Sequence, residues 1–227
     1  MERYNRQIIL PKVGETGQQK LVNARVLVVG AGGLGCPVLQ YLVAAGVGCI
    51  GIVDADVISI SNLQRQILFR ENQMGLPKAE QAKETLSALN SECRLNTYAC
   101  RLTEENAESL ISHYDIVVGA TDNFASRLLI DKYSKQLGKP FVHGSICEFG
   151  GQVSVFNYRG SMSYTDLFPD QPEESTLPLG VIGVLPGVIG TLQAAEVIKI
   201  ILGIGGVLAN KLLLYDLLKA ESRVVNF

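Results

Sequence analysis

The sequence predicts an α/β protein whose mostly parallel sheet is doubly wound, with helices on both faces. Two observations carry this prediction. Strand-like and helix-like stretches alternate along most of the chain, as they do where helices join parallel strands. The strand-like stretches are apolar runs rich in valine, which indicates strands buried on both faces. A hydrophobic content of 47% and a mean hydropathy of +0.21 agree with the large core that such a sheet needs.

The expected elements follow one another in a regular order. The apolar runs predict strands at about residues 25–30, 49–54, 95–100, 115–119 and 140–143. Helical patterns predict helices at about residues 34–45, 76–89, 103–112 and 123–137. Strands and helices in this order are typical of a Rossmann-like sheet.

The pattern changes after Gly144. Residues 152–156 alternate polar and apolar side chains, which indicates an added strand with one drier face. Residues 158–180 lack periodicity, and we expect a long, mobile crossing loop there. An apolar helix over 187–202 and a strand over 211–216 follow, so we expect an antiparallel C-terminal extension of the sheet. The whole chain, residues 1–227, is interpreted as a single domain.

The charge balance excludes two classes of partner. The chain has 20 Lys and Arg against 22 Asp and Glu, a net charge of −2. This near-balance provides no electrostatic footprint for nucleic acid or for an anionic membrane, and we expect neither as a partner. No apolar run is evident that reaches the roughly 18 residues of a membrane-spanning helix.

The N-terminal residues and the cysteines favour a cytoplasmic enzyme. The N-terminal residues are charged and lack the apolar core of a signal peptide. The cysteines form no CxxC pair and lie in or beside apolar segments, so we expect buried free thiols. They are Cys36, Cys49, Cys93, Cys100 and Cys147.

A glycine-rich turn follows the first expected strand. Gly30, Gly32 and Gly35 have the spacing G-x-G-x-x-G, with Gly33 between them. Such glycines let the backbone approach a phosphate chain, and the helix that follows points its N–H groups at the negative charge. Asp54 ends the next strand, at the usual place for an acid that binds a ribose hydroxyl. The pattern predicts a nucleotide site, and it is common to NAD and ATP.

Two cations beyond the ribose acid favour a triphosphate. Arg65 follows Asn62 and Gln64, and Lys78 comes shortly afterwards. Both cations are suited to neutralising the phosphates of ATP, whereas a dehydrogenase has no obvious need for them. The alternative is that both are solvated surface residues.

An acid at the end of the fourth strand completes the candidate site. Asp122 lies where the carboxyl ends of parallel strands line a ligand crevice. A carboxylate beside a triphosphate is well placed to hold Mg²⁺. Asp122 could instead cap the helix that follows, and the two roles are compatible.

Together these residues resemble the ThiF/MoeB/HesA family, the bacterial relatives of ubiquitin-activating enzymes. The resemblance covers nearly the whole chain, and the ordered set of motifs is far more specific than the glycine turn alone. Besides that turn, the matching motifs are Arg3–Ile8, Asp54 with Asp56, Ser61–Gln66, Gly75 with Pro77 and Lys78, Thr121–Asn123, and Gly187–Gln193.

The resemblance implies a reaction and a role for each residue. Members bind ATP and Mg²⁺ and adenylate the C-terminal glycine of a small ubiquitin-like sulfur carrier protein, releasing pyrophosphate. Asp54 matches the ribose-binding acid, with Asp56 close by, and Asp122 matches the metal-site carboxylate. The residues that match phosphate contacts are Asn62, Arg65 and Lys78. Arg6 matches an arginine that reaches the partner subunit's ATP, so a homodimer is expected.

The chain departs from the family pattern in two places. Many members bind a structural zinc through two CxxC pairs, and neither pair is present here, so we predict no zinc. Some members use a crossing-loop cysteine for covalent sulfur transfer, where this chain has Ser175 and Thr176. A threonine hydroxyl cannot replace a thiolate nucleophile, so the sequence does not favour a covalent sulfur-transfer step. The alternative is that Cys147 supplies the thiol.

Three other interpretations remain open. The first is a related enzyme that activates a tRNA base, of the threonylcarbamoyladenosine dehydratase type, although the opening motif and the lack of basic character count against it. The second is an NAD-dependent oxidoreductase, which leaves Arg65, Lys78 and Arg6 without a role. The third is a scaffold derived from a decayed enzyme, although every ATP-contact residue sought is present. Within the resemblance, the Gly35–Pro37 sequence and the missing zinc cysteines favour the thiamine pathway over that of molybdopterin.

Overall fold

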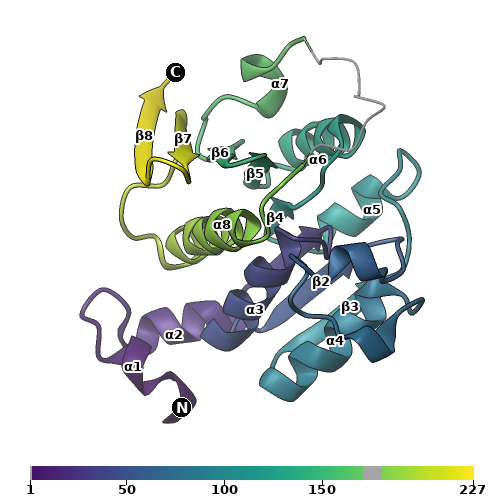
Figure 1. The fold of residues 1–227 in the computed structure, drawn as a ribbon. Helices are drawn as coiled ribbons and strands as arrows, with labels where there is room; N and C mark the ends of the chain where they lie inside the picture. The colour runs from purple at the N-terminus through teal and green to yellow at the C-terminus, as the bar shows by residue number, and fades with distance from the viewer. Residues whose placement is uncertain (1, 171–179) are drawn as a thin grey trace.

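The computed structural model describes residues 2–170 and 180–227. Within these residues one sheet of eight strands has the order β3-β2-β1-β4-β5-β6-β7-β8 (Figure 1). The strands β1 to β5 pair in parallel, and β6 to β8 extend the sheet in antiparallel fashion. The strand bounds are β1 Arg25–Val29, β2 Cys49–Val53, β3 Arg94–Tyr98, β4 Ile116–Gly119, β5 Phe141–Cys147, β6 Gly150–Phe156, β7 Lys211–Asp216 and β8 Glu221–Asn226.

Helices cover both faces of the parallel part of the sheet. One buried cluster joins α3, α4 and α8 to one face, and a second joins α5, α6 and α7 to the other. The helix α2 packs outside α8, near the N-terminus in Figure 1. The helix bounds are α1 Asn5–Ile8, α2 Gly14–Asn23, α3 Gly35–Ala45, α4 Lys78–Leu89, α5 Ala107–Ser112, α6 Phe124–Gln136, α7 Tyr164–Leu167 and α8 Val184–Leu202.

The predicted fold class is confirmed. Each predicted strand and helix is present, with ends that shift by a few residues. The largest differences are in β5, which continues to Cys147, and in α5, which begins only at Ala107. β5 is longer because its second half pairs with β6 in a hairpin, a long-range contact that no local pattern reveals.

One expected loop contains a helix. Residues 158–180 were predicted to lack regular structure, but α7 forms within them because Ser163 and Asp166 make a capping box. The Ser163 hydroxyl accepts a hydrogen bond from the Asp166 amide, and the Asp166 carboxylate accepts one from the Ser163 amide. Tyr164 is then buried among aromatic rings. Residues 171–179, and with them Ser175 and Thr176, lie outside the described residues.

Two further predictions need correction. The helix α8 is 19 residues long and apolar enough to span a membrane by length and composition, contrary to the expectation that no such run exists. It packs against α3, β5 and β6, as the core helix of a folded domain does. All five cysteines are free, but Cys100 is half-buried and Cys147 is exposed. Cys147 is exposed because it ends β5, at the hairpin to β6.

Candidate active site

The glycine loop is built from backbone packed too closely for side chains. Gly30 has a φ of +100°, and a Cβ placed there would lie 2.5 Å from the Ala120 carbonyl oxygen. A Cβ on Gly35 would collide with the Gly30 carbonyl oxygen. At Gly32 the space is open, and the nearest atom to a built Cβ is the Gln66 amide nitrogen at 3.6 Å. The loop therefore presents bare backbone at the start of α3, which suits a phosphate chain.

Asp54 holds this loop in place from the end of β2. Its carboxylate accepts hydrogen bonds from the Ala31 amide at 2.7 Å and from the Asp56 amide at 2.8 Å. Burial raises the pKa of Asp54 above its ordinary value, and the two amide hydrogen bonds oppose that rise. Carboxylate oxygens accept more than one hydrogen bond, so the ribose hydroxyls can still bind there. The loop-holding role is one that sequence reasoning missed.

Both predicted cations lie beside the loop. The buried Lys78 ammonium is 3.0 Å from the Asp56 carboxylate, and the Lys78 amide donates to the Asp56 carbonyl. The Arg65 Cδ lies 3.4 Å from the position of a Cβ built on Gly33. Arg65 also donates to the Ser61 carbonyl at 3.0 Å, which fixes its guanidinium at this edge. The alternative of two solvated surface cations is wrong for Lys78, because its side chain is only 6% exposed.

Asn62 has a structural role of its own. Its side-chain oxygen accepts a hydrogen bond from the Ser59 amide at 3.2 Å, closing the short 3-10 helix Ile60–Asn62. The turn that follows carries Arg65 toward the glycine loop, since the Arg65 amide donates to the Asn62 carbonyl. A contact from Asn62 to phosphate stays a prediction.

Asp122 is exposed in the turn after β4, next to the glycine loop. The Thr121 amide lies 3.5 Å from the position of a Cβ built on Gly30. The alternative that Asp122 caps the following helix is wrong, because Asn123 is the N-cap and accepts from the Ser126 amide at 2.8 Å. Asp122 is thus available for another role.

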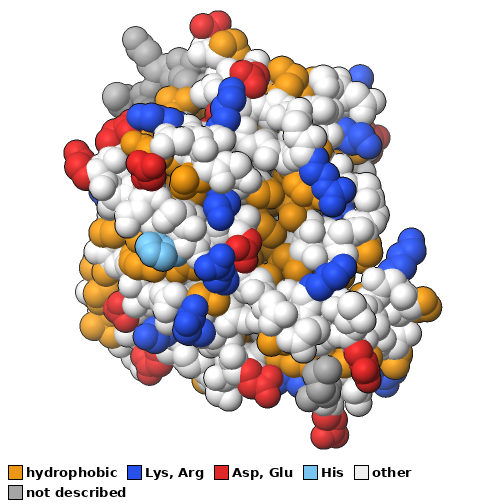
Figure 2. All heavy atoms as spheres, turned by 180° about the vertical axis from the view of Figure 1, so that it is seen from behind, with side chains coloured by type: hydrophobic (Ala, Val, Ile, Leu, Met, Phe, Trp, Pro, Cys, Tyr) orange, Lys and Arg blue, Asp and Glu red, His pale blue; other side chains and the backbone are white. Residues whose placement is uncertain are grey.

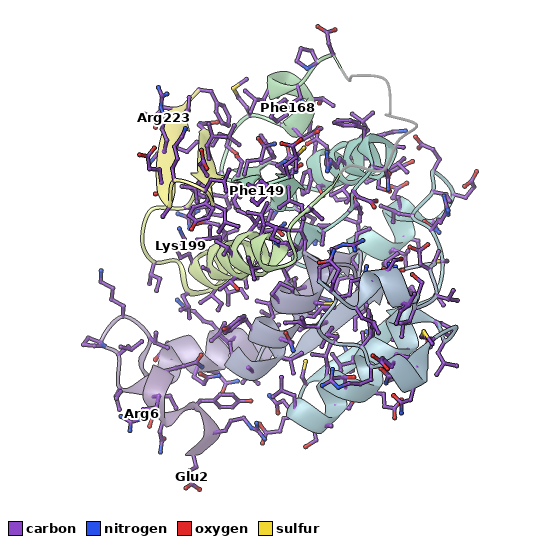
Figure 3. All side chains as sticks on the ribbon, viewed as in Figure 1. Glu2, Arg6, Phe149, Phe168, Lys199 and Arg223 are labelled. Carbon is purple, nitrogen blue, oxygen red and sulfur yellow. The ribbon has the colours of Figure 1, made fainter. Side chains whose placement is uncertain are left out.

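Arg6 is not brought to the site of its own chain. The neighbouring Gln7 side chain donates to the Ala45 carbonyl at the C-terminal end of α3, whereas the glycine loop lies at the other end. Eleven helical residues separate these ends by about 16 Å. Figure 3 shows Arg6 projecting from the N-terminal segment, away from the sheet. Any role for it in ATP chemistry requires a second copy of the chain.

Gln66 is a further candidate that sequence reasoning passed over. It is buried, its amide nitrogen faces Gly32, and its amide oxygen has no partner among the described residues. The Thr121 hydroxyl is likewise buried and without a partner there. Buried polar atoms are normally paired, so two orphans beside one loop indicate a missing ligand. A signal was available, since Gln66 ends the Ser61–Gln66 motif.

The residues present fit a magnesium nucleotide. In residues 2–170 and 180–227, no three His, Cys, Asp or Glu side chains gather as a metal cage. Mg²⁺ commonly takes only one or two carboxylates and completes its shell with phosphate oxygens and water. One exposed acid, a buried cation and a bare glycine loop are what such a ligand needs.

A sequence model of the ThiF family matches residues 4–227. The chain belongs to the ThiF family. Solved structures agree with the assignment: E. coli MccB with ATP superposes with a TM-score of 0.88 at 26% identity, over 99% of this chain and 71% of that one. The structure of PaaA, at 22% identity and a TM-score of 0.86, shows the same fold.

Curated ThiF-type relatives share more of the sequence. The sulfur carrier protein adenylyltransferase of Thermus thermophilus is 51% identical over 98% of this chain and 86% of its own length. MOCS3 of Culex quinquefasciatus, an adenylyltransferase and sulfurtransferase, is 49% identical over 94% of this chain. The probable molybdopterin-synthase adenylyltransferase of Porphyra purpurea is 47% identical over the same share. The chain spans 50% and 57% of the length of these last two relatives.

These ThiF-family relatives confirm the predicted enzyme class, an ATP-binding nucleotidyltransferase of the adenylyltransferase type. The individual site residues remain predictions, supported by their positions around the glycine loop.

Proposed function

We propose that this protein uses ATP and Mg²⁺ to adenylate the C-terminal Gly-Gly carboxylate of a small ubiquitin-like sulfur carrier. The observation that carries the proposal is the buried Lys78 ammonium beside a glycine loop that Asp54 holds in place. Adenylation fits the name of the Thermus relative, and the Gly-Gly tail follows from the family resemblance.

The reaction needs alignment rather than a strong base. The carrier's carboxylate is ionised near pH 7, so its oxygen attacks the α-phosphorus without losing a proton. A bond forms from that oxygen to the α-phosphorus, the bond to the bridging oxygen breaks, and pyrophosphate leaves. Arg65 and Lys78 hold the phosphates and offset the charge that builds on the leaving group.

Asp122 would hold the Mg²⁺ together with phosphate oxygens, and the metal supplies further charge neutralisation on the triphosphate. We expect no structural zinc, because the two CxxC pairs that bind it in other members are absent from the sequence.

The position of Arg6 supports the proposal of a homodimer. Its side chain lies at the far end of α3 from its own glycine loop, so the proposed contact with ATP needs the site of a partner subunit. We further propose that the enzyme acts in the cytoplasm, where sulfur carriers for thiamine or molybdopterin are handled. The proposal leaves the choice of carrier to experiment.

Two other functions are weaker. An NAD-dependent oxidoreductase would leave the buried Lys78 beside the phosphate loop without a task. A tRNA-modifying relative would need a basic surface, and on the face in Figure 2 the Lys and Arg side chains are interspersed with acidic ones.

The test is ATP–pyrophosphate exchange with Mg²⁺, using candidate carriers that end in Gly-Gly and the same carriers with the tail removed. Exchange that requires the intact tail is the expected result and identifies the carrier. Tight ATP binding with no exchange for any carrier would redirect the assignment to the tRNA-modifying relative. Binding of NAD but not ATP would overturn it.

A further inference from the structure

The segment that carries Arg6 is attached to the ends of two helices. Gln7 donates from its side-chain amide to the carbonyl of Ala45, the last residue of α3, at 3.1 Å. Arg3 donates to the carbonyl of Leu89, the last residue of α4, at 3.0 Å. The last carbonyls of a helix have no partner within the helix, so these N–H groups satisfy them. The N-terminal segment is thereby bound to both helices.

A buried polar cluster completes this attachment. The Gln18 side chain donates to the same Ala45 carbonyl at 3.0 Å and accepts from Gln7 at 2.9 Å. The Asn90 amide donates to the Tyr4 hydroxyl at 2.9 Å. Gln18, Asn90 and Tyr4 are 0%, 1% and 4% exposed, and buried groups that are paired in this way hold one geometry. The four side chains of this N-terminal anchor are those of Tyr4, Gln7, Gln18 and Asn90.

Tyr4 contacts the C-terminal ends of both helices. Gly46 follows α3 with a φ of +86°, and a Cβ built there would lie 2.6 Å from the Tyr4 ring. Only glycine therefore leaves room for the ring at this position. The hydroxyl accepts from Asn90, which follows α4, and donates to the Glu92 carboxylate at 3.2 Å.

The helices that hold the anchor also begin at the nucleotide site. α3 begins at Gly35 in the glycine loop, and α4 begins at Lys78. Each helix thus joins a part of the site at its start to the anchor at its end. Because helices are rigid, the anchor fixes the base of Arg6 relative to the rest of the subunit.

The Arg6 side chain itself is exposed. It takes part in none of the ion pairs found in the described part of the chain. Figure 3 shows it projecting away from the sheet. In the same segment, Ile9 and Leu10 are 67% and 52% exposed. An unpaired arginine beside exposed apolar side chains is typical of a surface that another chain covers.

A cation that serves another subunit needs a fixed base. The arginine side chain is long, so its guanidinium stays within hydrogen-bonding distance of a phosphate only if the backbone beneath it keeps its place. Gln7 follows Arg6 directly in α1, and its two hydrogen bonds fix the orientation of that short helix. The direction in which Arg6 leaves the subunit depends on them.

We propose that the N-terminal anchor positions Arg6 for the triphosphate bound by the partner subunit, and that Gln7 is the positioning residue nearest to it. This assignment rests on the proposed adenylation and on the proposed homodimer. Gln7 acts through Arg6 and does not itself contact ATP.

The first test is a double-mutant cycle on the full-length protein. Gln7→Met keeps the length of the side chain and removes both hydrogen bonds. Its kcat for ATP–pyrophosphate exchange, with a carrier that supports exchange, should fall by about tenfold, because small misplacements of a reacting group cost this much or more. The double variant with Arg6→Ala should be no slower than Arg6→Ala alone, since Gln7 then has no arginine to position. A merely structural glutamine would make the two losses multiply, and that result would overturn the assignment.

The controls separate positioning from folding. Gln19→Met removes a matched glutamine from α2, whose only side-chain partner in the described structure is the exposed Asn23. It should keep wild-type exchange. Melting temperature and mass in solution are measured for each variant, and Gln7→Met should remain a folded dimer. Tyr4→Phe removes one hydroxyl from the anchor and should show the same cycle, which provides the measurement if Gln7→Met does not fold.

The second test locates the defect in one subunit of the dimer. Gln7→Met refolded together with Arg65→Ala should regain about a quarter of wild-type exchange, since half of the dimers are hybrids with one complete site. In that site, an intact Arg65 meets an Arg6 that an intact anchor holds. Refolded with Arg6→Ala, Gln7→Met should regain nothing, because neither subunit supplies a correctly held Arg6. If Gln7 served the site of its own chain instead, this pattern would be reversed.

Failure of the anchor is distinguishable from failure of the proposed function. If no carrier supports exchange in the wild type, the adenylation and the role of the anchor both fail. If the wild type is active and Arg6→Ala does not complement Arg65→Ala, the cross-subunit contact fails and the anchor has no role in it. If those two variants complement but Gln7→Met is fully active, or gives the reversed pattern, only the role of the anchor fails.

Discussion

The Lys78 ammonium and the Asp56 carboxylate are 3.0 Å apart, yet the Lys78 side chain is 6% exposed and that of Asp56 is 62% exposed. An exposed carboxylate is a weak partner, because water competes for it. The buried Lys78 is thus paired with a carboxylate, that of Asp56, which can move into solvent when another anion binds. A phosphate arriving at the glycine loop can take the place of Asp56.

Replacement of Lys78 by Met should lower ATP–pyrophosphate exchange by about tenfold to a hundredfold, because a charged contact to the phosphates is lost. The fold should persist, since Met occupies similar space in a buried position. Lys219→Met is the matched control: it breaks the exposed pair with Asp216 and should leave exchange unchanged. Equal exchange in both variants would remove Lys78 from the site.

Two substitutions in the glycine loop should differ in effect, one on the melting temperature and the other on ATP binding. Gly35→Ala should lower the melting temperature, because its Cβ collides with the Gly30 carbonyl. Gly32→Ala should leave the melting temperature nearly unchanged, since its Cβ meets no atom closer than 3.6 Å, but should weaken ATP binding by filling the phosphate space. Thermal unfolding and nucleotide titration of the two variants check this. Undiminished ATP affinity in Gly32→Ala would place the phosphates elsewhere.

Substitutions at Asp122 and Asn123 should have different effects, the first on activity and the second on stability. Asp122→Asn should abolish Mg²⁺-dependent exchange and leave unfolding unchanged, because the side chain is exposed and does not cap α6. Asn123→Ala removes the cap and should cost about 0.5–2 kcal/mol of stability. Denaturant unfolding and exchange assays on both variants provide the measurements. Full exchange in Asp122→Asn would exclude the metal role.

The sequence predicted those parts of the fold and site that depend on local order. The valine-rich runs, the glycine spacing and Asp54 each follow from the chain around them, and the parallel sheet brings them together at one edge. The position of Lys78 beside the loop was predictable for the same reason, because Lys78 begins α4 at the edge of the sheet where the parallel strands end.

Elements that depend on contacts between residues far apart in the sequence were not predictable. The helix α2 escaped notice because it is largely polar and is held by long-range contacts such as that of the Gln18 side chain with the Ala45 carbonyl. Strand β8 is exposed along its whole length and lacks a buried face that would produce a pattern.

One buried histidine should contribute to a loss of stability in acid. His143 is fully buried, and burial lowers its pKa from 6.5 to about 3. Between pH 6.5 and about pH 3, this histidine is protonated in the unfolded chain but neutral in the native state. Lowering the pH from about 6.5 toward 3 therefore favours unfolding, by at most about 1.4 kcal/mol per pH unit.

The contribution of His143 is measured as a difference between variants. His143→Gln should flatten the pH dependence of the free energy of unfolding in this range, relative to wild type. His113→Gln replaces the only other histidine, which is exposed, and should keep the wild-type slope. Parallel curves for His143→Gln and wild type would contradict the buried neutral state.

Mixed dimers can test whether Arg6 acts across subunits. Arg6→Ala and Arg65→Ala should each be nearly inactive alone, because every site then lacks one cation. In a hybrid dimer, the subunit with an intact Arg65 receives Arg6 from its partner, so one of the two sites is complete. A one-to-one mixture should therefore regain about a quarter of wild-type exchange activity, since half of the dimers are hybrids. The mixture must be unfolded and refolded together, and separately refolded proteins mixed afterwards are the control. If co-refolding restores nothing while the hybrids are shown to form, Arg6 does not serve the partner's site.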